Sequence, residues 1–243
     1  MRGLNLAVFM LIIGGLFFIA PVNNAAEMTA AEVQNKVQQS IAMTYLGNND
    51  ITVDVNDDHK VTLDGTVETL YDKRRAFEAV AKTNGVKMIS NQIVVQHKIV
   101  PEKTIEQNIE MQLKIDASVP EWENIEVAVD NGVVFLRGNV SFYHEKMIAE
   151  DLAATQAGVK SVVNEIEVKP LDKAISDSNL ENYLMEIVND HYPNENDVMV
   201  DVKDGEVTIK GEANSLWAAY SMEEEFADVI GVRDIDNMLL IEE

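Results

Sequence analysis

The stretch GNVSFYHEKMIAEDLAATQAGVKSVVNEIEV, residues 138–168, determines how the whole chain is organised. It consists of a glycine, a gap, a Gly-Val pair, an asparagine and an alternating apolar end. The same pattern occurs in residues 65–95 and 211–241, so every marker advances by 73 residues from one copy to the next. The markers are Gly65, Gly138 and Gly211; Gly85, Gly158 and Gly231; and Asn91, Asn164 and Asn237. Self-similarity at a fixed period is the signature of a repeated module, so the chain uses one module three times.

Outside the quoted stretch, each copy begins with a helix followed by two strands. Apolar residues four apart, such as Ile105, Ile109 and Leu113, predict an amphipathic helix at the start of the second copy. Runs of alternating apolar residues then predict two half-buried strands. In the second and third copies the two strands are joined by Asn131-Gly132 and Asp204-Gly205. These dipeptides favour tight hairpins because both positions accept a positive φ.

A second helix and a third strand complete each copy. The third strand returns after a helix, so a right-handed crossover allows it to lie parallel to one hairpin strand. We therefore predict an α+β fold of three tandem small α-β-β-α-β modules, each a three-stranded mixed sheet with two helices on one face. The predicted modules span residues 29–98, 104–170 and 177–243.

The recurrent markers are interpreted as structural. Gly65, Gly138 and Gly211 lie near the end of the second strand, where we expect unusual φ/ψ or a close approach by a neighbour. Gly85, Gly158 and Gly231 are expected at the C′ position that ends the second helix. The three asparagines interrupt an apolar strand pattern, and we expect their side chains to satisfy nearby backbone groups at a bulge rather than to bind a ligand.

Residues 1–26 predict a secretory signal peptide. Arg2 precedes an apolar run from Leu4 to Ala20, and a small-polar stretch follows Pro21. The run is shorter than the roughly 20 residues of a spanning helix, and an uncleaved N-terminal anchor is the alternative to cleavage. The protein is therefore predicted to be periplasmic or otherwise exported. Since the chain has no cysteine, its fold does not rely on disulfides.

The composition is strongly acidic, with 19 Lys+Arg against 42 Asp+Glu and a formal net charge of −23. Such a charge repels nucleic acid and anionic bilayers over a Debye length, so a nucleic-acid partner is not expected. The sequence carries no signal for an oligomeric state.

No catalytic, metal or cofactor site is predicted. The four histidines, His59, His97, His144 and His191, have no partner three or four residues away and occupy different places in the copies. Neither a phosphate-binding glycine loop nor the spacing of an EF-hand occurs. We therefore expect a protein that is not an enzyme.

Two features are candidate contacts for a lipid or a partner. Lys73, Arg74 and Arg75 form the densest positive charge in the chain. They are interpreted as a solvated helix face, as a contact for lipid headgroups, or as a contact for an acidic neighbouring module. Trp122, beside Pro120, is interpreted as an interfacial aromatic or as a residue that packs over its own module's core.

The repeated pattern resembles the BON domain, the bacterial OsmY-and-nodulation module. The resemblance rests on a hairpin ending in Leu-x-Gly, as in Leu63-Asp64-Gly65, followed by a helix, the Gly-Val pair and the asparagine. The third copy departs slightly, with Ala213 where the others have Val67 and Val140. The resemblance implies an exported envelope protein that binds phospholipid or membrane surfaces, often under osmotic or envelope stress. It implies no catalytic residue.

Two function hypotheses follow. The first is a non-catalytic exported protein that binds phospholipid or membrane surfaces. The alternative is a periplasmic protein-interaction or chaperone-like factor that holds envelope proteins or peptides on the hydrophobic faces of its modules.

Overall fold

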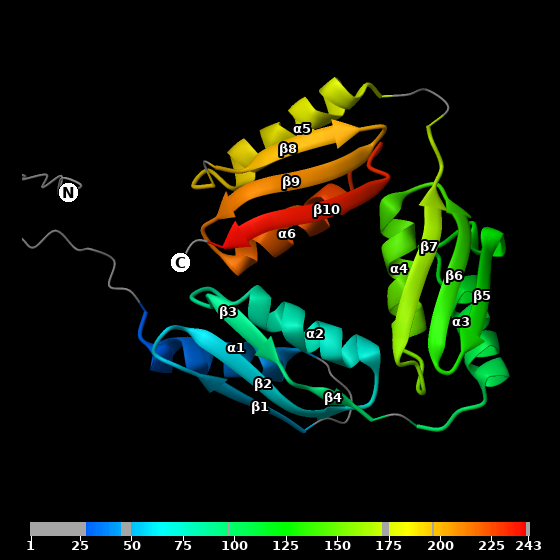
Figure 1. Cartoon of the computed structure of the whole chain (residues 1–243), viewed down its shortest axis with the longest axis horizontal. Coiled ribbons are helices and arrows are strands. Elements are labelled where there is room, and N and C mark those ends of the chain that lie inside the picture. Colours follow the sequence, from blue (N-terminus) through cyan, green and yellow to red (C-terminus); the bar gives the residue numbers. More distant parts are fainter. Residues whose placement is uncertain (1–27, 45–49, 97, 172–174, 196, 242–243) are drawn as a thin grey trace, which may run out of the picture.

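The computed structural model describes residues 28–44, 50–96, 98–171, 175–195 and 197–241 and consists of three tandem modules (Figure 1). The predicted signal peptide and His97 lie outside the described residues. Module 1 contains α1 (Ala30–Met43), β1 (Asp50–Val55), β2 (Lys60–Val67), α2 (Leu70–Ala81), β3 (Met88–Asn91) and β4 (Val94–Val95). Module 2 contains α3 (Glu102–Ile115), the 3-10 helix η1 (Trp122–Asn124), β5 (Ile125–Asp130), β6 (Val133–Val140), α4 (Tyr143–Ala154) and β7 (Ser161–Val168). Module 3 contains α5 (Asp177–His191), β8 (Met199–Lys203), β9 (Glu206–Ala213), α6 (Leu216–Ala227) and β10 (Asp234–Ile241).

The three sheets share one topology. The second strand (β2, β6 or β9) is central, pairs antiparallel with the strand before it and parallel with the strand after the second helix. Both helices of a module contribute to a single apolar core with the central strand, as Val37, Ala76 and Leu63 do in module 1. The predicted fold class is confirmed. Within the described residues, no helix is both long and apolar enough to cross a membrane.

Local capping explains where several of the helices begin. Thr29 and Glu32 form a capping box at α1, and the side chains of Thr69 and Ser215 accept backbone N–H groups at the starts of α2 and α6. At α4 the Glu145 carboxylate accepts the backbone N–H groups of Ser141 and Phe142. Glu145 is only 2% exposed, and these two charge-assisted hydrogen bonds offset the cost of burying its carboxylate.

The glycines of the central strands allow a close backbone approach. Gly65, Gly138 and Gly211 have φ of +129°, +126° and +111°. A Cβ atom on each would lie 1.8 to 1.9 Å from a backbone carbonyl oxygen at the start of the paired strand or up to two residues before it. Any side chain here would push the hairpin apart, which explains why the glycine recurs in all three copies.

Gly85, Gly158 and Gly231 were expected at the C′ positions of the second helices, but they do not occupy them. The helix α2 ends at Ala81 with Lys82 as its C-cap, so Gly85 lies three residues beyond the cap. A turn follows instead, closed by a hydrogen bond from the Val86 N–H to the Thr83 carbonyl at 3.3 Å. Gly85 takes its third position with φ of +96°, where a turn favours glycine. The turns at Gly158 and Gly231 are equivalent.

The marker asparagines bind backbone groups, as expected, but lie at no bulge. The Asn164 amide donates to the Lys146 carbonyl at 2.9 Å, and its oxygen accepts the Ile166 N–H at 3.2 Å. Asn237 makes the corresponding bonds in module 3. In module 1 the last strand is divided into β3 and β4, but both keep one register with β2, so no residue is inserted at Asn91.

The difference between two glycines of module 2 is testable. We expect Gly138→Ala to lower the free energy of unfolding by about 3 kcal/mol, and Gly132→Ala by about 1 kcal/mol. A Cβ would lie 1.9 Å from the Asn124 carbonyl oxygen in the first case and 2.9 Å from the Gly158 carbonyl oxygen in the second. Urea titration followed by Trp122 fluorescence, in a Trp217→Phe background, measures both. Equal losses would contradict the close-approach account.

Candidate functional site

The second helices of the three modules face one another at the centre of the molecule (Figure 1). The first residue of each of these helices packs against the core of the next module. Leu70 of α2 packs against the module 2 core, Tyr143 of α4 against the module 3 core, and Leu216 of α6 against the module 1 core. These three residues occupy the same repeat position, 73 residues apart. The contacts therefore run from module 1 to 2, from 2 to 3 and from 3 back to 1, and they close a ring.

Polar contacts reinforce each junction of the ring. Arg74 pairs with Glu150 of module 2 at 2.5 Å and with Asp151 at 3.7 Å. At the next junction Lys146 pairs with Asp234 at 3.1 Å. At the junction that closes the ring, Lys82 pairs with Glu224 of module 3 at 2.6 Å, and the rings of Phe77 and Tyr220 lie 5.5 Å apart. Exposed pairs contribute little individually, so the apolar residues described above dominate the packing energy.

The predicted basic cluster lies within this ring of contacts. Arg74 pairs across the junction, as described above. The Lys73 ammonium donates to the Ile93 carbonyl at 2.7 Å, and Arg75 pairs with Glu78 on its own helix at 3.1 Å. Each cation of the cluster already has a partner in the protein. Contact of the cluster with lipid is not tested by these contacts and stays a prediction. The geometry favours the acidic neighbouring module as the partner of Arg74.

Trp122, the other candidate, lies far from this cluster in the sequence, on η1 of module 2. It is partly buried and packs against the core of its own module. The Lys114 ammonium lies 5.6 Å from the centre of its ring, a cation–π contact. Among the described residues no contact joins Trp122 to the basic cluster, so the two candidates do not form one site.

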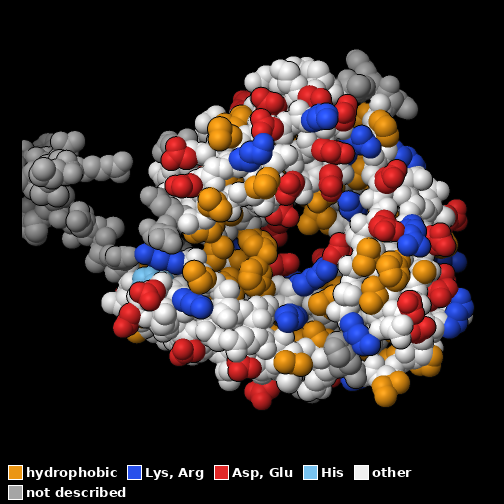
Figure 2. All heavy atoms as spheres, in the orientation of Figure 1, with side chains coloured by type: hydrophobic (Ala, Val, Ile, Leu, Met, Phe, Trp, Pro, Cys, Tyr) orange, Lys and Arg blue, Asp and Glu red, His pale blue; other side chains and the backbone are white. Residues whose placement is uncertain are grey.

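A cavity of about 420 Å³ lies where the three second helices meet. Arg74 and Phe77 of module 1, Met147 of module 2 and Tyr220 and Glu223 of module 3 line it. Figure 2 shows the molecule hollowed at its centre, where basic and acidic side chains meet. Many of these charges are already paired with one another, so the cavity presents few groups to a ligand.

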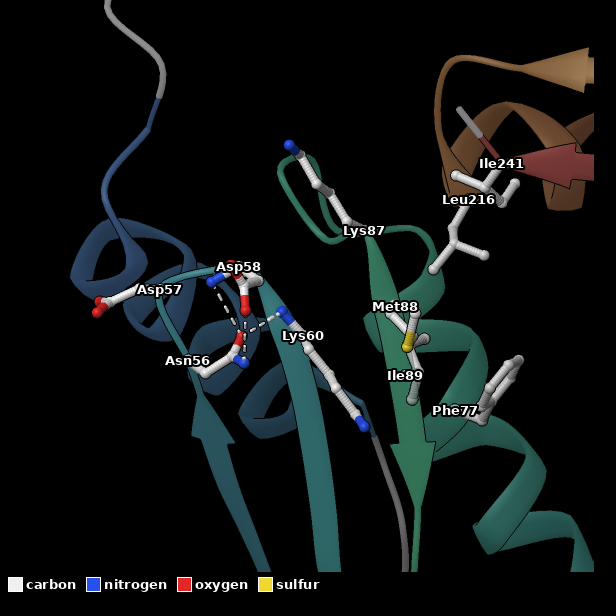
Figure 3. Close-up of a pocket in the computed structure, with 10 residues that line it drawn as sticks. All are labelled: Asn56, Asp57, Asp58, Lys60, Phe77, Lys87, Met88, Ile89, Leu216 and Ile241. Carbon is white, nitrogen blue, oxygen red and sulfur yellow. Dashed lines mark hydrogen bonds between the residues drawn. The ribbon is translucent and has the colours of Figure 1, made fainter. Parts of the chain in front are cut away.

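A larger groove of about 940 Å³ lies between modules 1 and 3, and we call it the closing groove. Its apolar lining comes from Phe77, Met88, Ile89, Leu216 and Ile241. Its polar lining comes from the turn at residues 56–60 and from Lys87 (Figure 3). The groove thus combines an apolar side and a charged side, as ligand pockets of about this size do.

The described residues contain no group of three or more His, Asp or Glu side chains placed to hold a metal ion. His59 is buried in the module 1 hairpin with φ of +57°, where it serves the turn. His144 and His191 lie beside single carboxylates. Nothing in this arrangement identifies a nucleophile and a base.

One titratable group belongs to the junction between modules 1 and 2. Burial, and then the neighbouring Glu78 carboxylate, raise the pKa of Asp151 to about 6, although Arg74 acts in the opposite direction. Glu150 also raises this pKa and Arg75 lowers it. Because an unfolded aspartate has a pKa of about 3.9, the folded protein binds more protons between about pH 4 and pH 6. This group therefore makes the protein less stable as the pH rises through that range.

The residues that join the modules were not predicted from the sequence. Leu70, Tyr143 and Leu216 lie at helix starts, ahead of the apolar positions by which the second helices were recognised. The available signal was their shared repeat position, which is large and apolar or aromatic in every copy. The residues of the closing groove had no such signal, because they come together from two modules that are not adjacent in the sequence.

Comparison with known families supports the repeat. The family model described as "BON domain" matches three segments, residues 23–97, 101–170 and 176–243. Each module contains one match. No curated protein matches the chain.

Two solved structures show distant similarity to the chain. The C-terminal domain of CdsD, a structural protein of the type III secretion system of Chlamydia trachomatis, is 16% identical, with 86% of this chain and 96% of that chain covered and a TM-score of 0.25. The periplasmic domain of the type III secretion inner membrane protein PrgH from S. typhimurium is 13% identical, with 79% and 93% covered and a TM-score of 0.21. Scores this low carry no argument about this chain.

The raised pKa of Asp151 at the junction between modules 1 and 2 predicts that the stability of the protein depends on pH. We expect Asp151→Asn to raise the melting temperature by about 1 to 3 °C above pH 6 and to leave it unchanged near pH 4. The effect is small because the Asp151 side chain is 49% exposed. Melting curves of wild type and variant across this pH range measure the difference, with Asp236→Asn on the open sheet face as the control. A difference that does not grow with pH would contradict the assignment.

Proposed function

The chain belongs to the BON domain family, with one domain in each of its three modules, and from this membership we propose that it is a non-catalytic envelope protein that binds phospholipid at a membrane surface. The observation that carries the proposal is that this domain accounts for nearly the whole described chain, so the function belongs to the domain or to its ring-shaped array. A role in osmotic or envelope stress and export to the periplasm are the finer parts of the proposal. They rest on the family and on the signal-like N-terminus.

Electrostatics restricts which membranes the protein favours. A net charge of −23 repels an anionic bilayer over the Debye length of about 8 to 10 Å. The basic cluster offers limited compensation, because Arg74 is held by Glu150 and Arg75 by Glu78. A neutral, zwitterionic surface imposes no such repulsion. We therefore propose that the protein prefers zwitterionic phospholipid to anionic phospholipid at low salt.

Binding of envelope proteins is the second candidate function, and one observation favours it. The open sheet face of module 3 exposes Met199, Met238 and Leu240, each more than half accessible. Exposed apolar groups on a sheet are candidate contacts for a protein partner. This hypothesis predicts protection of unfolded proteins from aggregation, whereas the lipid hypothesis does not.

Vesicle flotation tests the lipid proposal. We expect the protein without residues 1–26 to float with phosphatidylcholine–phosphatidylethanolamine vesicles, and to float less with vesicles enriched in phosphatidylglycerol at low salt. Raised salt should reduce the difference, because it screens the repulsion.

Two controls complete the flotation experiment. The variant with Lys73→Glu, Arg74→Glu and Arg75→Glu measures any contribution of the basic cluster, and a parallel assay measures protection of an unfolded protein from aggregation. Absence of flotation with every vesicle, together with strong protection, would overturn the lipid proposal in favour of protein binding.

A further inference from the structure

The three junctions of the ring are not filled equally. Where module 2 meets module 3, the side chains of Lys146 and Asp234 form an ion pair across the junction at 3.1 Å. The same two repeat positions at the junction of module 3 with module 1 hold Ala219 and Met88. A short side chain and an apolar one replace the ion pair there. The closing groove, of about 940 Å³, lies at this junction, and Met88 is 57% exposed beside it.

The closing groove changes character along its length. In Figure 3, Phe77, Leu216 and Ile241 lie on one side of it, whereas the turn at residues 56–60 lies on the other. Met88 and Ile89 stand between these two sides. A ligand that fits this arrangement is an amphiphile, with a hydrocarbon chain toward Leu216 and a polar group toward the turn.

The charges of the lining identify the polar group further. Lys60 and Lys87 provide two cations, and Asp57 and Asp58 provide two carboxylates, so this lining is neutral in a chain of net charge −23. A headgroup with both a phosphate and an ammonium group complements such a lining, whereas a purely anionic headgroup leaves Asp58 opposed by a like charge.

We propose that the closing groove binds one zwitterionic phospholipid, with its phosphate near Lys60, its ammonium group near Asp58, and one acyl chain against Met88 and Leu216. This proposal rests on the proposed function of phospholipid binding and adds the site and the class of headgroup. The volume of the groove lies within the range of about 300 to 1,000 Å³ that is typical of ligand pockets.

The location gives the bound lipid a structural consequence. Modules 1 and 3 are not consecutive in the chain, so their junction is held by non-covalent contacts alone, among them Leu216 in the module 1 core. A ligand that contacts both modules binds the closed ring and not an open one. By mass action it stabilises the closed form, so lipid binding and ring closure are coupled.

The test uses a short-chain phosphatidylcholine below its critical micelle concentration, with binding to the full three-module protein measured by calorimetry. We expect Met88→Glu to weaken binding at least about tenfold, because it places a carboxylate beside the acyl chain. Met111→Glu is the matched control, since Met111 is 61% exposed on module 2 but does not line the groove. We expect it to change binding by less than about twofold. Equal melting temperatures of the two variants establish that both are folded.

Two further ligands identify what the groove recognises. We expect short-chain phosphatidylglycerol to bind more weakly than the zwitterionic lipid, and free phosphocholine, which has no acyl chain, to bind weakest of the three. Equal binding by wild type and Met88→Glu, or a preference for the anionic lipid, would overturn the proposal.

Flotation separates failure of this site from failure of the proposed function. Vesicle binding that Met88→Glu leaves intact would refute the closing groove and retain a membrane-binding protein. Absence of both vesicle binding and short-chain lipid binding in the wild type would refute both, and competition by an unfolded polypeptide would assign the groove to protein binding.

Discussion

The packing of one residue from each second helix into the neighbouring core is the interaction on which the arrangement of the modules depends. Leu70, Tyr143 and Leu216 each begin the second helix of their own module and pack, partly buried, against the core of the next module. Full burial of a large apolar side chain contributes about 1.5 to 3 kcal/mol, and an exposed ion pair about 0 to 1 kcal/mol, so each partly buried contact contributes a fraction of the first value. Because the three contacts follow one another head to tail and the third returns to module 1, the array closes instead of extending, as heterologous contacts do when their rotation completes a circle.

Because the ring is closed, sequence differences between the three copies produce three different junctions. The modules share a fold that requires glycine at positions 65, 138 and 211, so their cores tolerate little variation there. The junctions vary instead. Arg74 meets Glu150 at one, Lys146 meets Asp234 at the second, and at the third, where the closing groove lies, two aromatic rings meet beside the Lys82–Glu224 pair. A site that takes residues from two modules can therefore exist at one junction and not at the others, although the domain is repeated.

Much of the module could be predicted from the sequence, whereas the ring could not. Periodicity reports which face of an element is buried, and it correctly identified the α-β-β-α-β order. The 73-residue repeat identified the glycines at which a neighbouring backbone comes close. The prediction that Gly85 lies at the C′ position of a helix was wrong, because a helix end and the turn just beyond it both favour a glycine with positive φ. Junction residues such as Leu70 and Arg74 have no periodic signature, and their partners lie in another module, 76 residues away in the case of Arg74 and Glu150. The charge of Lys73, Arg74 and Arg75 was visible, but a local count of charges does not tell whether a carboxylate from another module neutralises it.

The most direct test of this account measures the distance between modules 1 and 3 in solution. The chain has no cysteine, so spin labels can be attached specifically to Asn84→Cys after α2 and Ile230→Cys after α6, both at exposed positions. Pulsed electron paramagnetic resonance should give one narrow distance distribution, and Leu216→Glu should broaden it, since that change removes the contact that closes the ring. A broad distribution in the otherwise unchanged protein, or a narrow one that Leu216→Glu leaves intact, would contradict a ring closed by this residue.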